Sequence, residues 1–181
     1  VSVGASIESM KGRPFISGLP RYATGGDIGL PRSTFLGADW NRWDSEQTSL
    51  FAELQHRFNA DWTVKATAGY TREKHDMKYA FALGAINPAT LAGNEMYAGL
   101  FDVTTDNKTL DVAVDGKFDA FGLEHELTVG VNASRSNKDD FYSVAFLPQR
   151  QNVFNPDKFI PEPDDSYFIE NSSRGGPVKS K

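Results

Sequence analysis

The side chains most often used for catalysis or metal binding are few in this sequence and lie far apart. The 181 residues include no Cys and only three His, which are His56, His75 and His125. The lack of Cys excludes a disulfide framework and a thiolate-ligated metal, and the wide spacing of the His residues matches no metal-ligand motif. Adjacent acidic residues such as Asp139 and Asp140 are expected to be solvated, with weak Ca²⁺ binding as the alternative. We therefore predict no catalytic residue, no metal site and no resident cofactor, and we do not expect an enzyme.

The composition argues against a helical membrane protein and against a nucleic-acid-binding protein. Mean hydropathy is -0.45, and no run approaches the ~20 apolar residues of a membrane-spanning helix. The formal net charge of -5 provides no basic footprint for nucleic acid. A membrane β-barrel is still compatible with these values, because its strands alternate lipid-facing and lumen-facing residues. The sequence begins inside a patterned segment, so we expect an internal piece of a longer protein.

Five segments alternate between apolar and polar residues with a period of two, which predicts β-strands. Trp62, Val64, Ala66, Ala68 and Tyr70, for example, alternate with small or polar neighbours. The other segments are 1–9, 48–58, 110–118 and 127–133. No segment of comparable length shows a helical period, so the chain is predicted to be all-β.

The connections between these segments favour a membrane barrel over a soluble sandwich. Tight turns are predicted at 58–62 and 118–122, whereas the joins at about 12–43, 83–95 and after 147 are long. Phe58, Trp62, Phe118 and Phe121 would form an aromatic girdle at the short-turn end. Runs without Pro at about 62–81 and 97–118 exceed the ~5–6 residues of an ordinary strand. The prediction is an antiparallel transmembrane β-barrel fragment of about five strands, with short periplasmic turns and long extracellular loops.

Several motifs resemble those of the TonB-dependent ferric-siderophore receptors, especially the ferric-pyoverdine and ferric-coprogen receptors. They are GLPRYA at 18–23, GDIGLPRST at 26–34, ADW at 38–40, FAELQHRF at 51–58 and GKFDAFGLEHEL at 116–127. The resemblance covers residues 1 to about 163. It implies a barrel of about 22 strands whose lumen is plugged, and a plug domain with a box that contacts TonB. Neither plug nor box is recognisable here. Residues 1–165 are assigned to a partial barrel and 166–181 to an irregular tail or truncated loop.

The resemblance also implies a ligand and the side chains that would bind it. A ferric siderophore brings its iron already saturated by oxygen ligands, so the iron is cargo, and the receptor would supply flat side chains and hydrogen-bond donors. The candidates in the first long loop and beside the second are Arg21, Tyr22, Arg32, Trp40, Trp43, Tyr79 and Tyr97. The alternatives are an upper aromatic belt for Trp40 and Trp43, and contact with lipopolysaccharide or solvent for Arg21 and Arg32.

The expected function is therefore active import of a ferric siderophore across the outer membrane of a Gram-negative bacterium, with energy from the TonB complex. Outer-membrane lipid and lipopolysaccharide are further expected partners. A passive porin would share the strand pattern but lack a plug. A soluble secreted β-sandwich binding module is the other alternative, which the long strands disfavour.

Overall fold

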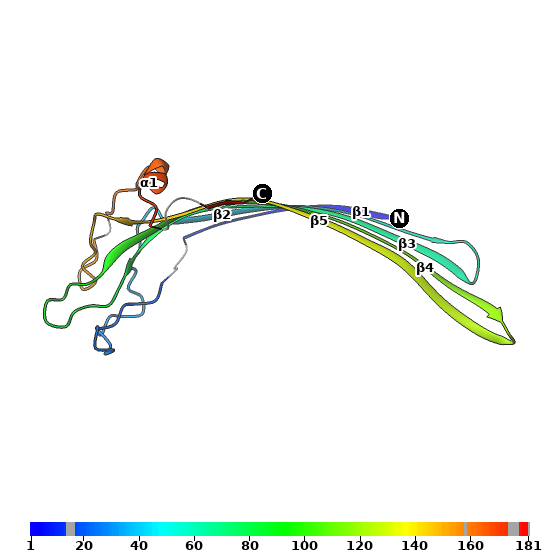
Figure 1. Ribbon diagram of the computed structural model, residues 1–181, viewed down its shortest axis with the longest axis horizontal. Coiled ribbons are helices and arrows are strands. Elements are labelled where there is room, and N and C mark those ends of the chain that lie inside the picture. Colours follow the sequence, from blue (N-terminus) through cyan, green and yellow to red (C-terminus); the bar gives the residue numbers. More distant parts are fainter. Residues whose placement is uncertain (14–16, 158, 174–177, 181) are drawn as a thin grey trace.

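The computed structural model describes residues 1–13, 17–157, 159–173 and 178–180. It contains one antiparallel sheet with the strand order β1-β2-β3-β4-β5-β6. The elements are β1 Ser2–Gly12, β2 Arg42–Arg57, β3 Trp62–Leu83, β4 Glu95–Ala120, β5 Leu123–Leu147, α1 Asp165–Glu170 and β6 Val178–Ser180. Figure 1 shows the sheet as a long bowed wall with the two short turns at one end and the long connections at the other. The predicted five-strand antiparallel wall is confirmed.

Local chemistry explains the two tight turns. In the turn between β2 and β3, the side-chain oxygen of Asn59 accepts hydrogen bonds from the backbone N–H groups of Asp61 and Trp62, both at 2.9 Å. In the turn between β4 and β5, Phe121 and Gly122 adopt φ angles of 56° and 79°. Two central residues with positive φ are what a two-residue type I′ hairpin turn requires. Both turns lie where the sequence predicted them.

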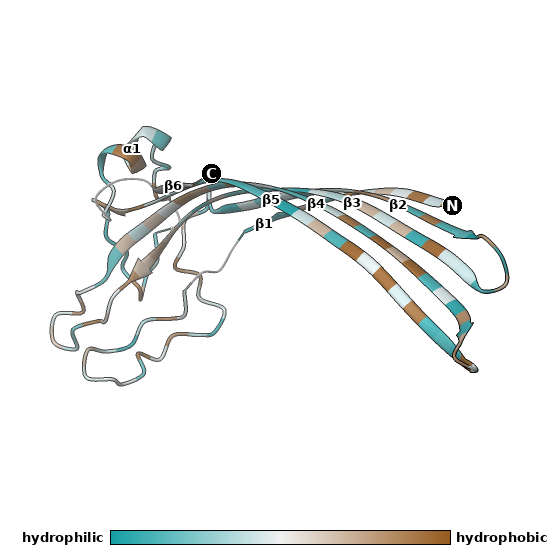
Figure 2. Ribbon diagram, turned by 45° about the vertical axis from the view of Figure 1, so that its right-hand side comes forward, coloured by the Kyte–Doolittle hydropathy of each residue, from teal (hydrophilic) through white to brown (hydrophobic). Residues whose placement is uncertain are grey.

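The wall has two faces of different chemistry toward the short-turn end. The outer face carries the apolar residues of the predicted alternation, and its large members are well exposed, as in Ile7 (81%) and Val131 (63%). The inner face carries their small and polar neighbours. The alternating colours of β3, β4 and β5 in Figure 2 show this pattern along each strand. No helix of the described residues is long and apolar enough to cross a membrane.

At the loop end, the connections cover the outer face and form a small hydrophobic core. Small strand residues such as Ala80, Ala98 and Ala145 are buried there beneath loop residues that include Ile86 and Val153. The first loop also hydrogen-bonds to the edge of β3 that β2 does not cover. The residues that make these ties are Leu36, Ala38 and Asn41, which hydrogen-bond to the backbones of Ala80 and Ala82. The loops are therefore anchored to the strands.

The described part of the segment after β5 contains one short helix and one short strand. Asp164 caps α1, because its side chain accepts a hydrogen bond from the backbone N–H of Ser166 at 3.1 Å. Phe168 is fully buried on the outer face, and its carbonyl accepts a hydrogen bond from Ser143. Further on, β6 pairs with β5 at residues 140–142. One apolar anchor and one cap order a helix too short for a periodic sequence signal.

Candidate ligand-binding wall

Seven aromatic side chains gather on the inner face near the loop end, and they form what we call the aromatic wall. Cross-strand register places them on one face of four neighbouring strands: Trp43 lies opposite Met77, which lies opposite Phe101, which lies opposite Tyr142. Four residue steps nearer the loops, Phe81 lies opposite Tyr97, and Tyr97 lies opposite Phe146. The members of the wall are Trp43, Tyr79, Phe81, Tyr97, Phe101, Tyr142 and Phe146.

The six rings of the wall that lie on β3, β4 and β5 contact one another in a continuous series. Tyr79 stacks on Phe81 with ring centroids 5.7 Å apart and on Phe101 at 5.9 Å. Phe101 packs against Tyr142 at 4.3 Å. Tyr97 lies 5.8 Å from Phe81 and meets Phe146 edge-on at 5.2 Å. These separations lie within or just below the range of favourable aromatic pairs, so the wall is preorganised by its own packing.

Gly99 allows the wall to be this flat. A Cβ at Gly99 would overlap the ring of Tyr79, which lies across its backbone on the neighbouring strand. Tyr79 is consequently only 5% exposed, whereas Trp43 (40%) and Phe146 (43%) are open to a ligand. The wall thus combines a buried tyrosine with accessible flat side chains, which suits it to stacking on a planar or compact ligand.

The structure divides the candidate residues from the sequence into two groups. Trp43, Tyr79 and Tyr97 belong to the aromatic wall. Trp40 instead packs against the hydrophobic core, and its indole N–H donates to the carbonyl of Ile160 at 2.9 Å. Tyr22 also packs against that core.

Arg21 and Arg32 are exposed in the first loop, and the Arg21 guanidinium donates to the carbonyl of Gly25 at 3.4 Å. The structure brings neither arginine to the wall. Sequence reasoning missed Phe81, Phe101, Tyr142 and Phe146, although the even spacings of 79 to 81, 97 to 101 and 142 to 146 indicate one face of each strand.

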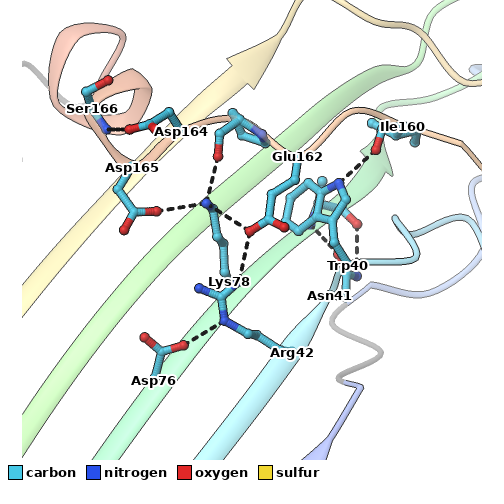
Figure 3. A network of polar contacts seen from close by, with 12 residues as sticks. Trp40, Asn41, Arg42, Asp76, Lys78, Ile160, Glu162, Asp164, Asp165 and Ser166 are labelled. Carbon is cyan, nitrogen blue, oxygen red and sulfur yellow. Dashed lines mark hydrogen bonds and ion pairs between the residues drawn. The ribbon is translucent and has the colours of Figure 1, made fainter.

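A polar network on the outer face holds the segment after β5 against the strands (Figure 3). The Lys78 side chain is 4% exposed, and its ammonium group lies 2.8 Å from Asp165 and 3.1 Å from Glu162. It also donates to the carbonyl of Pro163 at 2.6 Å. Arg42 bridges Glu162 and Asp76, both at 2.9 Å. The network joins β2 and β3 to the third long loop.

The charges of this network set the titration of Glu162. Partial burial alone would raise the pKa of its carboxyl group, but hydrogen bonds and charges from Lys78 and Arg42 outweigh burial and lower the pKa below its ordinary value. The ionised carboxylate is therefore the form that the folded loop favours. No three His, Asp or Glu side chains of the described residues converge as metal ligands.

The long strands, the exposed apolar outer face and the aromatic inner face define a segment of an outer-membrane β-barrel. The family model described as "TonB dependent receptor-like, beta-barrel" matches residues 9–175. The chain belongs to this family of TonB-dependent receptors, which are transport proteins of the Gram-negative outer membrane and not enzymes. This membership decides against the porin and the soluble sandwich.

Individual relatives agree with the family match. The chain is 50% identical over 179 residues, 98% of its length, to the ferric-pyoverdine receptor PbuA of a Pseudomonas species, and it covers 22% of that protein. It is 31% identical over 143 residues to the ferripyoverdine receptor of Pseudomonas aeruginosa, and this alignment covers 76% of the chain and 17% of that receptor.

A solved structure of Pseudomonas aeruginosa FpvA bound to a pyoverdine–iron complex superposes on 99% of the chain with a TM-score of 0.65 and 22% identity. The chain spans 23% of that structure. At this identity the superposition supports the barrel fold. The chain therefore spans about a fifth of the relatives it matches.

Proposed function

We propose that the parent protein captures a ferric siderophore of the pyoverdine type outside the cell and imports it with energy from TonB. The observation that carries the proposal is the aromatic wall on the inner face, which in a closed barrel faces the lumen. Relatives named as ferric-pyoverdine receptors support the choice of siderophore. In this proposal, 1–165 form part of the barrel wall, and the plug and the TonB-contacting box belong to other parts of the parent protein.

The chemistry of the wall fits a ligand whose metal is already saturated. A ferric siderophore presents flat conjugated groups and oxygen-rich edges, and it needs no metal ligand from the receptor. Phe101, Phe81 and Phe146 offer ring surface, and Trp43 adds an indole N–H that can donate a hydrogen bond. Each stacked ring contributes about 0.5–1.5 kcal/mol beyond the area it buries. Several rings acting together would give tight binding without any covalent step.

Tryptophan fluorescence provides the test, since Trp43 and Trp40 differ in their surroundings but lie three residues apart. The full-length parent protein, purified in detergent, is titrated with ferric pyoverdine and with iron-free pyoverdine. We expect saturable quenching by the ferric form, and Trp43→Phe should remove a larger share of the quenching than the matched control Trp40→Phe. Phe101→Leu should weaken binding by about tenfold, which is about 1.4 kcal/mol.

Two outcomes would count against the proposal. If no ferric siderophore quenches saturably, the protein carries another substrate. If Phe101→Leu binds as tightly as the unaltered protein while Phe58→Leu, at the short-turn end, weakens binding, the ligand does not contact the aromatic wall.

A further inference from the structure

Trp43 differs from the other six members of the aromatic wall, because its ring contacts no other aromatic ring of the described residues. It also does not lie across the glycine opposite it, as the ring of Tyr79 lies across Gly99. A Cβ at Gly12, which is opposite Trp43, would come within 4 Å of only one atom, the backbone carbonyl oxygen of Trp43. The indole is 40% exposed. Trp43 is therefore the ring of the wall that its own packing does not hold in place.

Met77 occupies the position between Trp43 and the other rings. It lies opposite Trp43 on one side and opposite Phe101 on the other, and it is half-buried. The remaining positions of this row from β2 to β5 are all aromatic, and Phe101 is held by Tyr79 and Tyr142. A methionine side chain is unbranched and flexible, and its sulfur makes favourable contacts with aromatic rings. Met77 is thus an adaptable side chain between one free ring and one fixed ring.

The separation of these two rings suits one further flat group. Neighbouring strands lie about 4.8 Å apart, so the backbones at Trp43 and Phe101, two strands from each other, are separated by roughly 9.6 Å. A ring placed midway would lie about 4.8 Å from each neighbour, within the ~4.5–7 Å of favourable aromatic pairs. Met77 admits such a ring by folding its flexible side chain toward the sheet, which a bulky aromatic residue at position 77 could not do.

We propose that the planar conjugated group of the ferric siderophore lies between Trp43 and Phe101 on the thioether of Met77, and that Met77 determines which planar groups the wall accepts. This inference rests on the proposed import function and assigns one part of the ligand to one place on the wall. Phe101 provides the fixed side of the site, and Trp43 closes on the bound group from the other side. Met77 is the specificity-determining residue because its shape sets the depth and width that remain between the two rings.

The test measures binding of ferric pyoverdine, carrying radioactive iron, to the full-length parent protein in detergent. Met77→Leu keeps the size of the side chain but removes the sulfur, and it should weaken binding about threefold through the loss of sulfur–aromatic contacts. Met77→Phe fills the space between the two rings, and it should weaken binding at least tenfold. Both variants should unfold at the same temperature as the unaltered protein, which separates an effect on the ligand from an effect on folding.

The matched controls are Met10→Leu and Met10→Phe. Met10 is 49% exposed and lies on β1 opposite Ser45, on the inner face but on the side of Trp43 that is away from Phe101. The Met10 variants should bind ferric pyoverdine as the unaltered protein does. A double-variant cycle gives a second test: in a Trp43→Leu protein, which lacks one side of the site, adding Met77→Leu should weaken binding by less than about twofold.

The outcomes separate this inference from the function on which it rests. If the unaltered protein does not bind ferric pyoverdine, the proposed function fails and the inference falls with it. If the unaltered protein binds and the Met77 variants bind as tightly as the Met10 variants, the inference alone is overturned. Tighter binding by Met77→Phe would overturn it too, because the planar group would then lie on top of the wall. Fully independent effects of Trp43→Leu and Met77→Leu would show that the two residues do not share one site.

Discussion

The Lys78 network allows a prediction that compares the loss of stability in two variants. Which variant loses more is more informative than the size of either loss. The first perturbation, Lys78→Met, removes the buried ammonium and keeps a flexible chain of similar length. The second, Glu162→Gln/Asp165→Asn, keeps the ammonium and removes both carboxylate partners. Lys78→Met removes the two ion pairs of Lys78 and its hydrogen bond to the Pro163 carbonyl, whereas the carboxamide variant removes the same two ion pairs and the pair between Arg42 and Glu162. A simple count of contacts therefore predicts equal destabilisation of the third long loop.

The exposures of the partners predict unequal effects. Glu162 is 42% exposed and Asp165 65%, so both carboxylates regain water when Lys78 is removed. Partly exposed pairs contribute about 1 kcal/mol or less each, and removing the desolvated ammonium offsets part of that loss. Lys78→Met should therefore cost about 1 kcal/mol of local stability. The double carboxamide variant leaves the buried cation with the Pro163 carbonyl, the Phe168 ring at 5.6 Å and weaker amide dipoles, for which about 3–5 kcal/mol is expected.

Hydrogen exchange of residues 148–171 in the detergent-solubilised parent protein measures this local stability. The double carboxamide variant should exchange faster than Lys78→Met by at least tenfold in that segment, while the amides of β3 near Val64 should be unaffected in both. If Lys78→Met opens the segment more than the carboxamide variant does, the ion pairs contribute more than burial costs, and our reasoning is refuted.

Three further predictions follow from the same structure. The carboxylate of Glu162 stabilises the folded loop at pH values above its ordinary pKa of 4.5, and this contribution is lost as the pH falls through the lowered pKa. Hydrogen exchange of residues 148–171 should therefore accelerate on acidification below about pH 4.5, and it should accelerate less in Glu162→Gln. Gly99→Val should displace Tyr79, cost about 1–3 kcal/mol by overpacking and weaken siderophore binding, whereas Gly12→Val, whose Cβ meets only one backbone oxygen at 3.9 Å, should do neither. The isolated 181-residue chain should require detergent, because its apolar outer face would be exposed to water and its open sheet edges would pair with other chains. A soluble, monodisperse and cooperatively unfolding sample would contradict this.

Most of the fold was predictable because its determinants are local. Alternation with a period of two and the turn residues Asn59 and Gly122 specify strands and hairpins without reference to distant parts of the chain. The helix α1 was not predictable in the same way. It has six residues and one buried anchor, Phe168, and it depends on packing against β5 that no local pattern reports.

The aromatic wall was only partly predictable because its members come from four strands. Phe101 and Tyr142 read as ordinary strand residues until the register brings them together. The two tryptophans of the first loop illustrate the difficulty, since both looked equally suited to a ligand. Trp40 lies in a turn before β2, whereas Trp43 is the second residue of that strand, so the two side chains are positioned by different kinds of local structure. Trp40 packs in the loop core, and Trp43 lies on the inner face.

The β3–β4 pairing runs without a bulge from Trp62 opposite Gly116 to Leu83 opposite Glu95. This unbroken register restricts which changes of sequence the two strands can accept. Inserting or deleting a single residue within either strand would exchange the lipid-facing and lumen-facing side chains beyond that point, removing the aromatic wall and the membrane band together. Length changes are therefore tolerated in the long loops and excluded from the strands. New ligand preferences in such a barrel must therefore arise by substitution at fixed positions of the sheet, or by changes in the loops that connect its strands.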